Sequence, residues 1–157
     1  MAAGSIVVLS RGTYVAFLHL PHDTDIQVGK LGRYEFQSGF YAYVGSARGP
    51  GGLAARLRHH SNPTPRPHWH IDYLRKMTRL DQVWLMESDK LREHAWAAIL
   101  PTLDGATLSM RRFGASDCIC KTHLFHFQRQ PRLCSFQKLV RNRFPNDSLV
   151  RVLKPNR

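Results

Sequence analysis

The sequence predicts an α+β domain, in which a small central and mainly antiparallel β-sheet is flanked by helices. Two observations predict this class. Segments rich in β-branched and aromatic residues come first, separated by glycine turns, and stretches of good helix formers come later. A chain of 157 residues with 43% hydrophobic content can build one core. We therefore expect a single domain over 1–157, with its core at about 12–128 and a basic C-terminal extension at about 129–157.

The first third of the chain predicts strands. Residues 13–20 are β-branched and aromatic and end at Pro21, as a core strand does. Residues 26–46 alternate between glycine turns, which predicts a hairpin that leads into a second core strand. The turns are expected at Gly29, Gly32 and Gly39.

Helical segments begin after the turn at 49–52. Residues 53–60 are good helix formers and stop at Asn62-Pro63, and the proline-rich stretch 63–67 predicts an extended, stiff loop. The remaining elements are expected as a helix at 69–77, a strand at 83–86, a helix at about 90–100 capped by Ser88 or Asp89, weaker strands at 107–112 and 123–128, and a basic amphipathic helix at 133–143.

The charge of the chain is concentrated at its C-terminal end. The formal net charge is +12; residues 1–110 hold twelve Lys or Arg against nine Asp or Glu, and residues 111–157 hold eleven against two. Such a basic region suits a polyanion, because each phosphate that it neutralises releases condensed counterions. We favour a nucleic-acid partner over a solvated basic face without specific function.

Targeting signals and cysteine usage indicate the compartment. The first residues carry no charged start and only a short apolar run, and no stretch approaches the length of a membrane span. Three cysteines are an odd number, which argues against a disulfide framework. We expect a cytoplasmic protein without a membrane partner.

Two tyrosines next to glycines are the first residues that suggest chemistry. They occur as Gly12-Thr-Tyr14 and Tyr43-Val-Gly45, in strands expected to be neighbours. Ser46-Ala47 and a glycine-rich turn follow, and then a helix in which Arg56 and His60 are four residues apart and share one face.

This order of motifs resembles the GIY-YIG signature of excision-repair nucleases and homing endonucleases. The family's set is completed by a glutamate on a later helix, a place that Glu93 matches. Further motifs are similar to the Uri-type branch and extend the resemblance over 12–127: Gly29-Lys-Leu-Gly32, Gly51-Gly-Leu-Ala-Ala-Arg56, His68-Trp-His-Ile-Asp-Tyr73 and Phe113-Gly-Ala-Ser-Asp-Cys-Ile-Cys120. The resemblance implies a GIY-YIG-type endonuclease that hydrolyses phosphodiester bonds in DNA with one Mg²⁺ or Mn²⁺ ion. Its catalytic set would be Tyr14, Tyr43, Arg56 and Glu93, assisted by His60.

The chemistry of phosphodiester hydrolysis is consistent with these residue types. The planar fork of Arg56 can clamp the scissile phosphate, and the carboxylate of Glu93 can hold a hydrated Mg²⁺. A tyrosine acts as a base only if a neighbouring cation lowers its pKa, which is normally near 10. Tyr43 is the first choice for the base and Tyr14 the second, and His60 could assist or position phosphate.

The spacing of the two tyrosines departs from the simpler family members. Tyr14 and Tyr43 lie 29 positions apart, further than in those members, so a hairpin must be inserted between them. This insertion leaves open whether the substrate groove is similar.

Other polar residues are candidates for binding the nucleic acid. They are Ser46, Arg48, Arg58, His68, Trp69, His70, Lys121, Arg129, Arg132, Lys138, Arg141 and Arg143. Trp69 could stack on a base, and His68 with Asp72 could bind metal or phosphate or could form an ordinary helix start. Cys118-x-Cys120-x-x-His123 contains metal-capable ligands but lacks the second pair of a closed zinc site, so zinc is not favoured. Ser116, Asp117 and the turn at Gly114 could instead position a loop beside the active site.

Two further functions remain open from the residues alone. One is a nucleic-acid-binding module that keeps this fold without cutting, and the other is a protein that recognises acidic protein surfaces. A pure nucleic-acid binder has no need of a carboxylate such as Glu93 next to phosphate, where it repels unless a cation intervenes. Salt-sensitive binding to DNA but not to acidic peptides would count against the second function. The sequence does not separate DNA from RNA, single from double strands, or monomer from oligomer.

Overall fold

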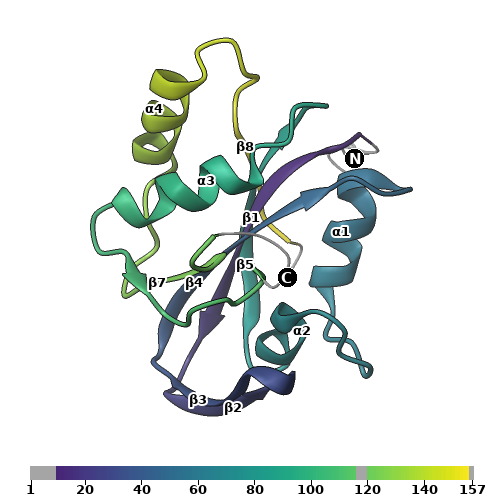
Figure 1. Ribbon diagram of the computed structural model, residues 1–157, viewed down its shortest axis with the longest axis vertical. Coiled ribbons are helices and arrows are strands. Elements are labelled where there is room, and N and C mark those ends of the chain that lie inside the picture. Colours follow the sequence, from purple (N-terminus) through teal and green to yellow (C-terminus); the bar gives the residue numbers. More distant parts are fainter. Residues whose placement is uncertain (1–9, 116–119, 156–157) are drawn as a thin grey trace, which may run out of the picture.

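A six-stranded antiparallel sheet forms the centre of the protein. The computed structural model describes residues 10–115 and 120–155, and its sheet has the order β6-β7-β4-β1-β5-β8, with every pairing antiparallel (Figure 1). The strands are β1 (Gly12–Leu20), β4 (Gly39–Ala47), β5 (Arg79–Glu87), β6 (Thr107–Leu108), β7 (Leu124–Phe127) and β8 (Arg151–Leu153). The predicted α+β class and its antiparallel sheet are therefore confirmed.

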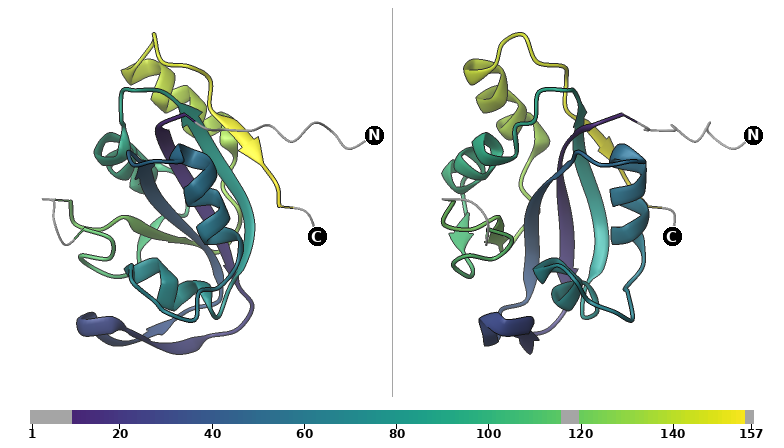
Figure 2. Two further views of the ribbon diagram at one scale, coloured as in Figure 1. Left: turned by 90° about the vertical axis from the view of Figure 1, so that its right-hand side faces the viewer. Right: turned by 45° about the vertical axis from the view of Figure 1, so that its right-hand side comes forward.

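Helices cover both faces of this sheet. The helices are α1 (Gly52–Ser61), α2 (His70–Arg75), α3 (Glu93–Ile99) and α4 (Leu133–Arg143), with short 3-10 turns at Gly29–Leu31 and Leu100–Thr102. The pair α1 and α2 lies on one face and the pair α3 and α4 on the other (Figure 2). Among the described residues, none of the helices has the length and apolar character that crossing a membrane requires.

The alternation of β1 explains the two helix layers. Successive side chains of a strand point to opposite faces, and almost every residue of β1 is buried. Tyr14 and Leu18 belong to the core that α1 and α2 cover, while Val15 and Phe17 belong to the core under α3 and α4. A strand without a polar face has to be covered on both sides, because apolar surface left in water costs free energy.

A separate hairpin lies at one end of the sheet, as the glycine turns predict. It consists of β2 (Thr24–Val28) and β3 (Gly32–Phe36), and its apolar residues Ile26 and Val28 are buried in the core beside α2. Gly32 has a φ of 111°, in the region that favours glycine.

The basic C-terminal part contributes to the core. Phe136 and Val140 of α4 are buried in the core under α3, where Phe136 packs against Trp84 of β5, and β8 forms the edge strand beside β5. The sequence gives no strong pattern for β8, because a strand of three residues is too short for one. Residues 129–155 therefore add a layer to the domain and carry exposed cations on its outer side.

The third helix begins later than predicted. It was expected from about Lys90 with Ser88 or Asp89 as its cap, but α3 begins at Glu93, and the N-cap residue before it, Arg92, makes no side-chain cap bond. The Ser88 hydroxyl accepts the N–H of Lys90 and closes a turn before the helix.

Long-range bonds of Arg92 determine this start. Its backbone N–H donates to Thr13 Oγ1 at 2.8 Å, and its guanidinium binds both carboxylate oxygens of Asp147 at 2.9 and 3.0 Å. These partners are remote in sequence, so the cap pattern around residue 88 could not reveal them. The helix therefore starts at the residue that the resemblance assigns to the metal.

The predicted strand at 107–112 is also shorter than expected. Only Thr107 and Leu108 pair with β7. Arg112 has a φ of 65°, which turns the chain, and its N–H bonds to the carbonyl of Lys121. The segment is therefore a loop that is tied to the approach to β7.

We predict that Gly12→Ala destabilises the fold by about 1–3 kcal/mol, in the range of overpacked cores. A Cβ at Gly12 would lie 2.2 Å from the carbonyl oxygen of Met86 and 2.6 Å from Leu53 Cδ1, so β1, β5 and α1 would have to separate. The free energy of unfolding in urea measures the effect. Gly49→Ala is the matched control, because a Cβ there meets nothing within 4 Å. Equal stability of the two variants would contradict the prediction.

Candidate active site

A polar pocket of about 330 Å³ lies at the edge of β4, where β7 leaves it. The two strands pair only from Phe40 to Tyr43, and beyond that point the N–H of Val44 bonds to the carbonyl of His123. The pocket is lined by Tyr14, Tyr43, Gly45, Ser46, Arg48, Arg56, Trp69, Glu93, His94, Gly114 and His123. All four residues of the predicted catalytic set therefore surround one hollow.

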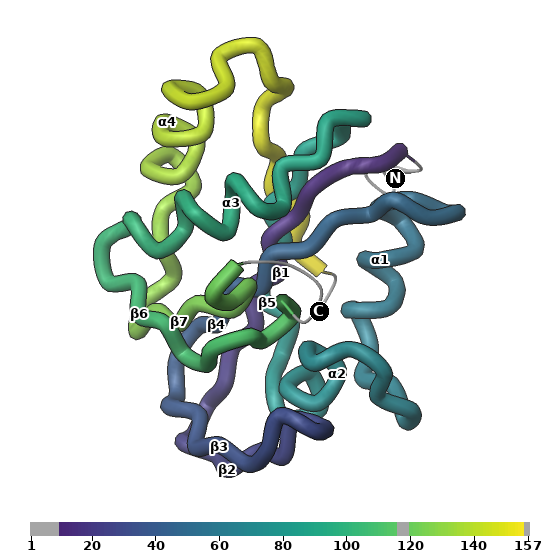
Figure 3. The backbone as a smooth tube through the Cα atoms, in the orientation of Figure 1, coloured from purple at the N-terminus to yellow at the C-terminus, as the bar shows by residue number. Residues whose placement is uncertain are grey.

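Because the pocket lies at an edge of the sheet, it receives side chains from both helix layers. The α1 and α2 segment and the α3 and α4 segment run on opposite sides of β1 and β4 (Figure 3). Arg56 and Trp69 come from the first layer, and Glu93 reaches the pocket from the second. A pocket on a face of the sheet could not combine them.

The glycine of the second motif makes room for the tyrosine of the first. Gly45 is the pairing partner of Tyr14 across β1 and β4, and a Cβ at Gly45 would lie 2.4 Å from the Tyr14 hydroxyl oxygen. The ring of Tyr14 lies over this glycine and is 1% exposed. This contact explains physically why the sequence has a glycine there.

Tyr14, at the wall of the pocket, and His60, behind it, form a buried pair. The hydroxyl and His60 Nε2 share a hydrogen bond of 2.8 Å. Burial and the neighbouring Tyr43 raise the pKa of Tyr14 well above its usual value, and burial lowers the pKa of His60 to about 3. Both groups are therefore neutral at neutral pH, and His60, which was expected to assist, does not line the pocket.

Glu93 is the acidic residue among the described lining residues, and it has two partners. The Ser46 hydroxyl donates to its Oε2 at 2.9 Å, and His123 Nδ1 lies 3.3 Å from its Oε1. Burial alone would raise the pKa of Glu93, but the hydrogen bonds from His123 and Ser46 outweigh it and lower the pKa. The carboxylate is therefore ionised at neutral pH, and Ser46, predicted to touch nucleic acid, holds Glu93.

Arg56 lies against an aromatic ring. Its Cζ is 4.2 Å from the centroid of the Trp69 ring, a cation–π contact. His59 lies against the same ring, with centroids 4.6 Å apart. Trp69 therefore holds the guanidinium at the pocket, which leaves its N–H groups to meet an anion.

Asp72 fixes the start of α2, and with it Trp69. Its Oδ2 accepts the N–H groups of His68 and Trp69, each at 2.9 Å, and its Oδ1 accepts His59 Nε2 at 2.6 Å. The carboxylate is 2% exposed. Of the two interpretations left open for His68 and Asp72, these bonds support the ordinary helix start for Asp72.

Arg75, at the end of α2, connects this helix to the end of α1. It is buried, and it donates to the carbonyls of His60 and Ser61 at the end of α1. A cation at a helix C-terminus stabilises the carbonyls that have no partner inside the helix. No local pattern in the sequence marks Arg75, because these partners lie in another helix.

The loop that contains Gly114 forms one wall of the pocket. The N–H of Gly114 donates to His70 Nδ1 at 2.9 Å, and a Cβ at Gly114 would lie 3.0 Å from Tyr43 Cε1. His70, predicted to bind nucleic acid, therefore attaches this loop to α2. Ser116, Asp117 and Cys118, which were considered beside it, lie outside the described residues.

The remaining predicted binding residues lie apart from the pocket. Arg58 and His68 are exposed on the α1 and α2 side, and Lys121 borders a second, mostly apolar hollow. Arg129 and Arg132 border a third hollow, and the α4 cations are exposed beyond α3. These α4 cations are Lys138, Arg141 and Arg143.

His94 is a pocket residue that the sequence did not suggest. It follows Glu93 at the start of α3 and is exposed. A histidine next to a predicted glutamate ligand is a weak signal, since most surface histidines have no such role. Its neighbours become visible only in three dimensions.

We predict that Asp72→Asn lowers the free energy of unfolding by about 1–3 kcal/mol at neutral pH, because an ionised buried hydrogen-bond acceptor is lost. Burial raises the pKa of Asp72, but the bonds from His68, Trp69 and His59 lower it further, to below its usual value. Its contribution is present above the unfolded-state pKa of about 4 and is lost as the pH falls through the lower folded-state pKa.

The measurement is urea unfolding at pH 7 and near pH 3. The difference between the wild type and Asp72→Asn should shrink at the lower pH. Asp25→Asn is the control, because this aspartate is exposed. A difference that is independent of pH would mean that the lost contribution is packing and not charge.

Comparison with known proteins finds no curated protein and no solved structure that matches this chain. Residues 13–144 match the family described as domain of unknown function DUF123. This match covers most of the chain and includes every residue that lines the pocket. The chain therefore belongs to the DUF123 family.

Proposed function

We propose that this protein is a GIY-YIG-type endonuclease of the Uri-type branch, which hydrolyses phosphodiester bonds in DNA with one Mg²⁺ or Mn²⁺ ion. The observation that carries the proposal is the arrangement around one pocket of Tyr14, Tyr43, Arg56 and Glu93. These residues come from two strands and two helices that are well separated in the sequence, and all four line the same pocket.

Arg56 is the proposed phosphate clamp. Its flat guanidinium can bind two oxygens of one phosphate, and the ring of Trp69 already orients it. Because the Arg56 side chain is already ordered in the folded protein, it loses less conformational entropy when the phosphate binds. Arg48, exposed at the rim of the pocket, adds a second positive charge.

Glu93 is the residue that would hold the cation. Mg²⁺ prefers oxygen ligands and retains waters, and Glu93 offers an ionised carboxylate, 19% exposed, beside the Ser46 hydroxyl. This donor set fits the ion. When bound, the ion supplies positive charge that stabilises the phosphoryl group and the departing oxygen.

Tyr43 is the proposed general base. It is half-buried and lines the pocket beside the Gly114 loop, so a water in the pocket can reach it. Tyr14 suits the role less, because burial raises its pKa and His60 binds its hydroxyl. We assign to Tyr14 and His60 the task of fixing β1 against α1.

The substrate is proposed to be DNA, with RNA as the alternative to test. The exposed cations of α4 and the loop before it offer a surface for a polyanion outside the pocket. The hairpin of β2 and β3 is proposed to be the insertion that distinguishes this chain from simpler members of the GIY-YIG family. The proposed location of the protein is the cytoplasm.

Cleavage assays test the catalytic proposal. With Mg²⁺ or Mn²⁺ and a panel of single-stranded, duplex and branched DNA and RNA, the wild type should cut internally and leave 5′ phosphates. Arg56→Ala and Glu93→Gln should each lower kcat/KM by about 10²–10³, the usual loss when one charge-stabilising group is removed. Gel analysis of end-labelled substrates measures the rates.

Arg58→Ala is the matched control for Arg56→Ala, because Arg58 lies on the same helix, is exposed and does not line the pocket. Its rate should stay within about tenfold of the wild type. If the wild type binds DNA in a salt-sensitive manner but cuts none of the substrates, the non-catalytic binding module is the better function. If Arg56→Ala and Glu93→Gln cut as well as the wild type, another site is responsible.

Phenylalanine variants distinguish the roles of Tyr43 and Tyr14. Tyr43→Phe should lower kcat by about 10²–10⁴, the usual contribution of a general base. Tyr14→Phe should instead lower the free energy of unfolding by about 1–3 kcal/mol, because His60 loses a buried partner. For each variant, kcat and the free energy of unfolding in urea are measured. A larger loss of kcat in a stably folded Tyr14→Phe would reverse the assignment.

A further inference from the structure

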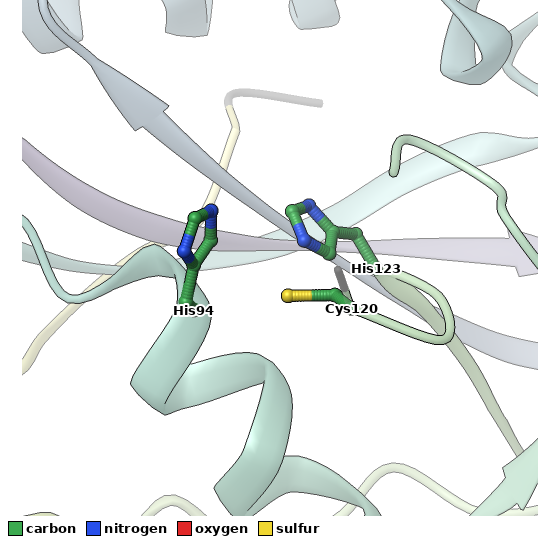
Figure 4. Close-up of side chains that lie close together, drawn as sticks. All are labelled: His94, Cys120 and His123. Atoms are coloured by element: carbon green, nitrogen blue, oxygen red, sulfur yellow. The ribbon is translucent and has the colours of Figure 1, made fainter. Parts of the chain in front are cut away.

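Three metal-capable side chains meet beside the pocket. His94 comes from α3, and Cys120 and His123 come from the loop before β7 (Figure 4). Their ligand atoms all lie within 4.8 Å of one another. We propose that these three residues form a binding site for a divalent transition metal of the zinc class, separate from the ion that Glu93 would hold.

The donor atoms specify the class of metal. Two imidazoles and one thiol are ligands that zinc and similar ions prefer, whereas Mg²⁺ and Ca²⁺ prefer oxygen. A tetrahedral zinc, with bonds of about 2.0–2.3 Å, holds neighbouring ligand atoms roughly 3.3–3.8 Å apart. From separations of at most 4.8 Å, side-chain movements of about an ångström would close the site.

The backbone that carries two of the ligands is fixed. The N–H of His123 bonds to the carbonyl of Phe113 at 2.8 Å, and its carbonyl accepts the N–H of Val44 at 2.9 Å. The carbonyl of Lys121, next to Cys120, accepts the N–H of Arg112. A site on such a framework loses little backbone entropy when an ion binds.

The exposure of the ligands gives the ion a way in. His123 is buried, Cys120 is half-buried and His94 is exposed. His94 borders both the polar pocket and an apolar hollow of about 360 Å³, which Cys120 also lines. The ion would therefore lie between two hollows, with its fourth position open to water, as in zinc sites that act on substrates.

Glu93 is next to this site. Its Oε1 is 3.3 Å from His123 Nδ1, close enough to orient the ring. The site does not depend on DNA cleavage, so it extends beyond the proposed function.

Zinc titration tests the site directly. Tag-free, chelator-treated protein is titrated with Zn²⁺ against a chromophoric chelator, and the bound metal is quantified by mass spectrometry. The wild type should bind one Zn²⁺ per chain with an affinity that excess Mg²⁺ does not change. Replacement by Co²⁺ should give visible absorption bands with a thiolate-to-metal component.

Two ligand variants and two matched controls give the contrast. His94→Ala and Cys120→Ser should weaken zinc binding by at least about a hundredfold, and Cys120→Ser should remove the thiolate band. Cys134→Ser and His22→Ala should bind as the wild type does, because both residues are exposed and outside the cluster. His94 is exposed, so its variant should keep the fold, which urea unfolding without metal checks.

The proposal is overturned if the wild type binds no zinc, or if His94→Ala and Cys120→Ser bind it as tightly as the controls. Its failure is distinguishable from failure of the nuclease proposal. Cleavage with Mg²⁺ is measured on the zinc-free protein, and zinc binding is measured without DNA. Either result can be positive while the other is negative.

Discussion

The close approach of β1 and β4 is the constraint on which the rest of the site depends. Tyr14 lies over Gly45, and at 2.4 Å a Cβ at position 45 would overlap the hydroxyl. With the ring seated there, the hydroxyl reaches His60 of α1, and this contact places α1 and Arg56 beside β4. The two glycine–tyrosine motifs are therefore parts of one packing arrangement, whatever chemistry the pocket performs.

Most of the fold could be predicted because its signals are local. The β-branched and aromatic residues of β1, the glycine turns of the hairpin and the stop at Asn62-Pro63 each specify their own element. Elements determined by remote partners could not be predicted in this way. The start of α3 depends on Thr13 and Asp147, and β8 exists because β5 offers it a free edge.

The same distinction applies to the site. Tyr14, Tyr43, Arg56 and Glu93 stand in an ordered pattern along the chain, and the pocket brings them together. The roles of their supporting residues follow from contacts that no spacing reveals. Ser46 holds Glu93, His70 holds the Gly114 loop, and Asp72 caps α2 while binding His59. His94 has no sequence relation to the Cys120 and His123 segment, and only the path of α3 brings it there.

Both helix layers contribute residues to the pocket, and this has a consequence for stability. Arg56 belongs to the layer whose core contains Leu53, and Glu93 to the layer whose core contains Trp96. If either helix layer opened by itself, the pocket would lose the lining residues that this layer contributes. A ligand that contacts both halves is therefore linked to closure of both layers, and its binding free energy adds to the stability of each. Occupancy of this pocket should appear as slower amide hydrogen exchange on both faces of the sheet.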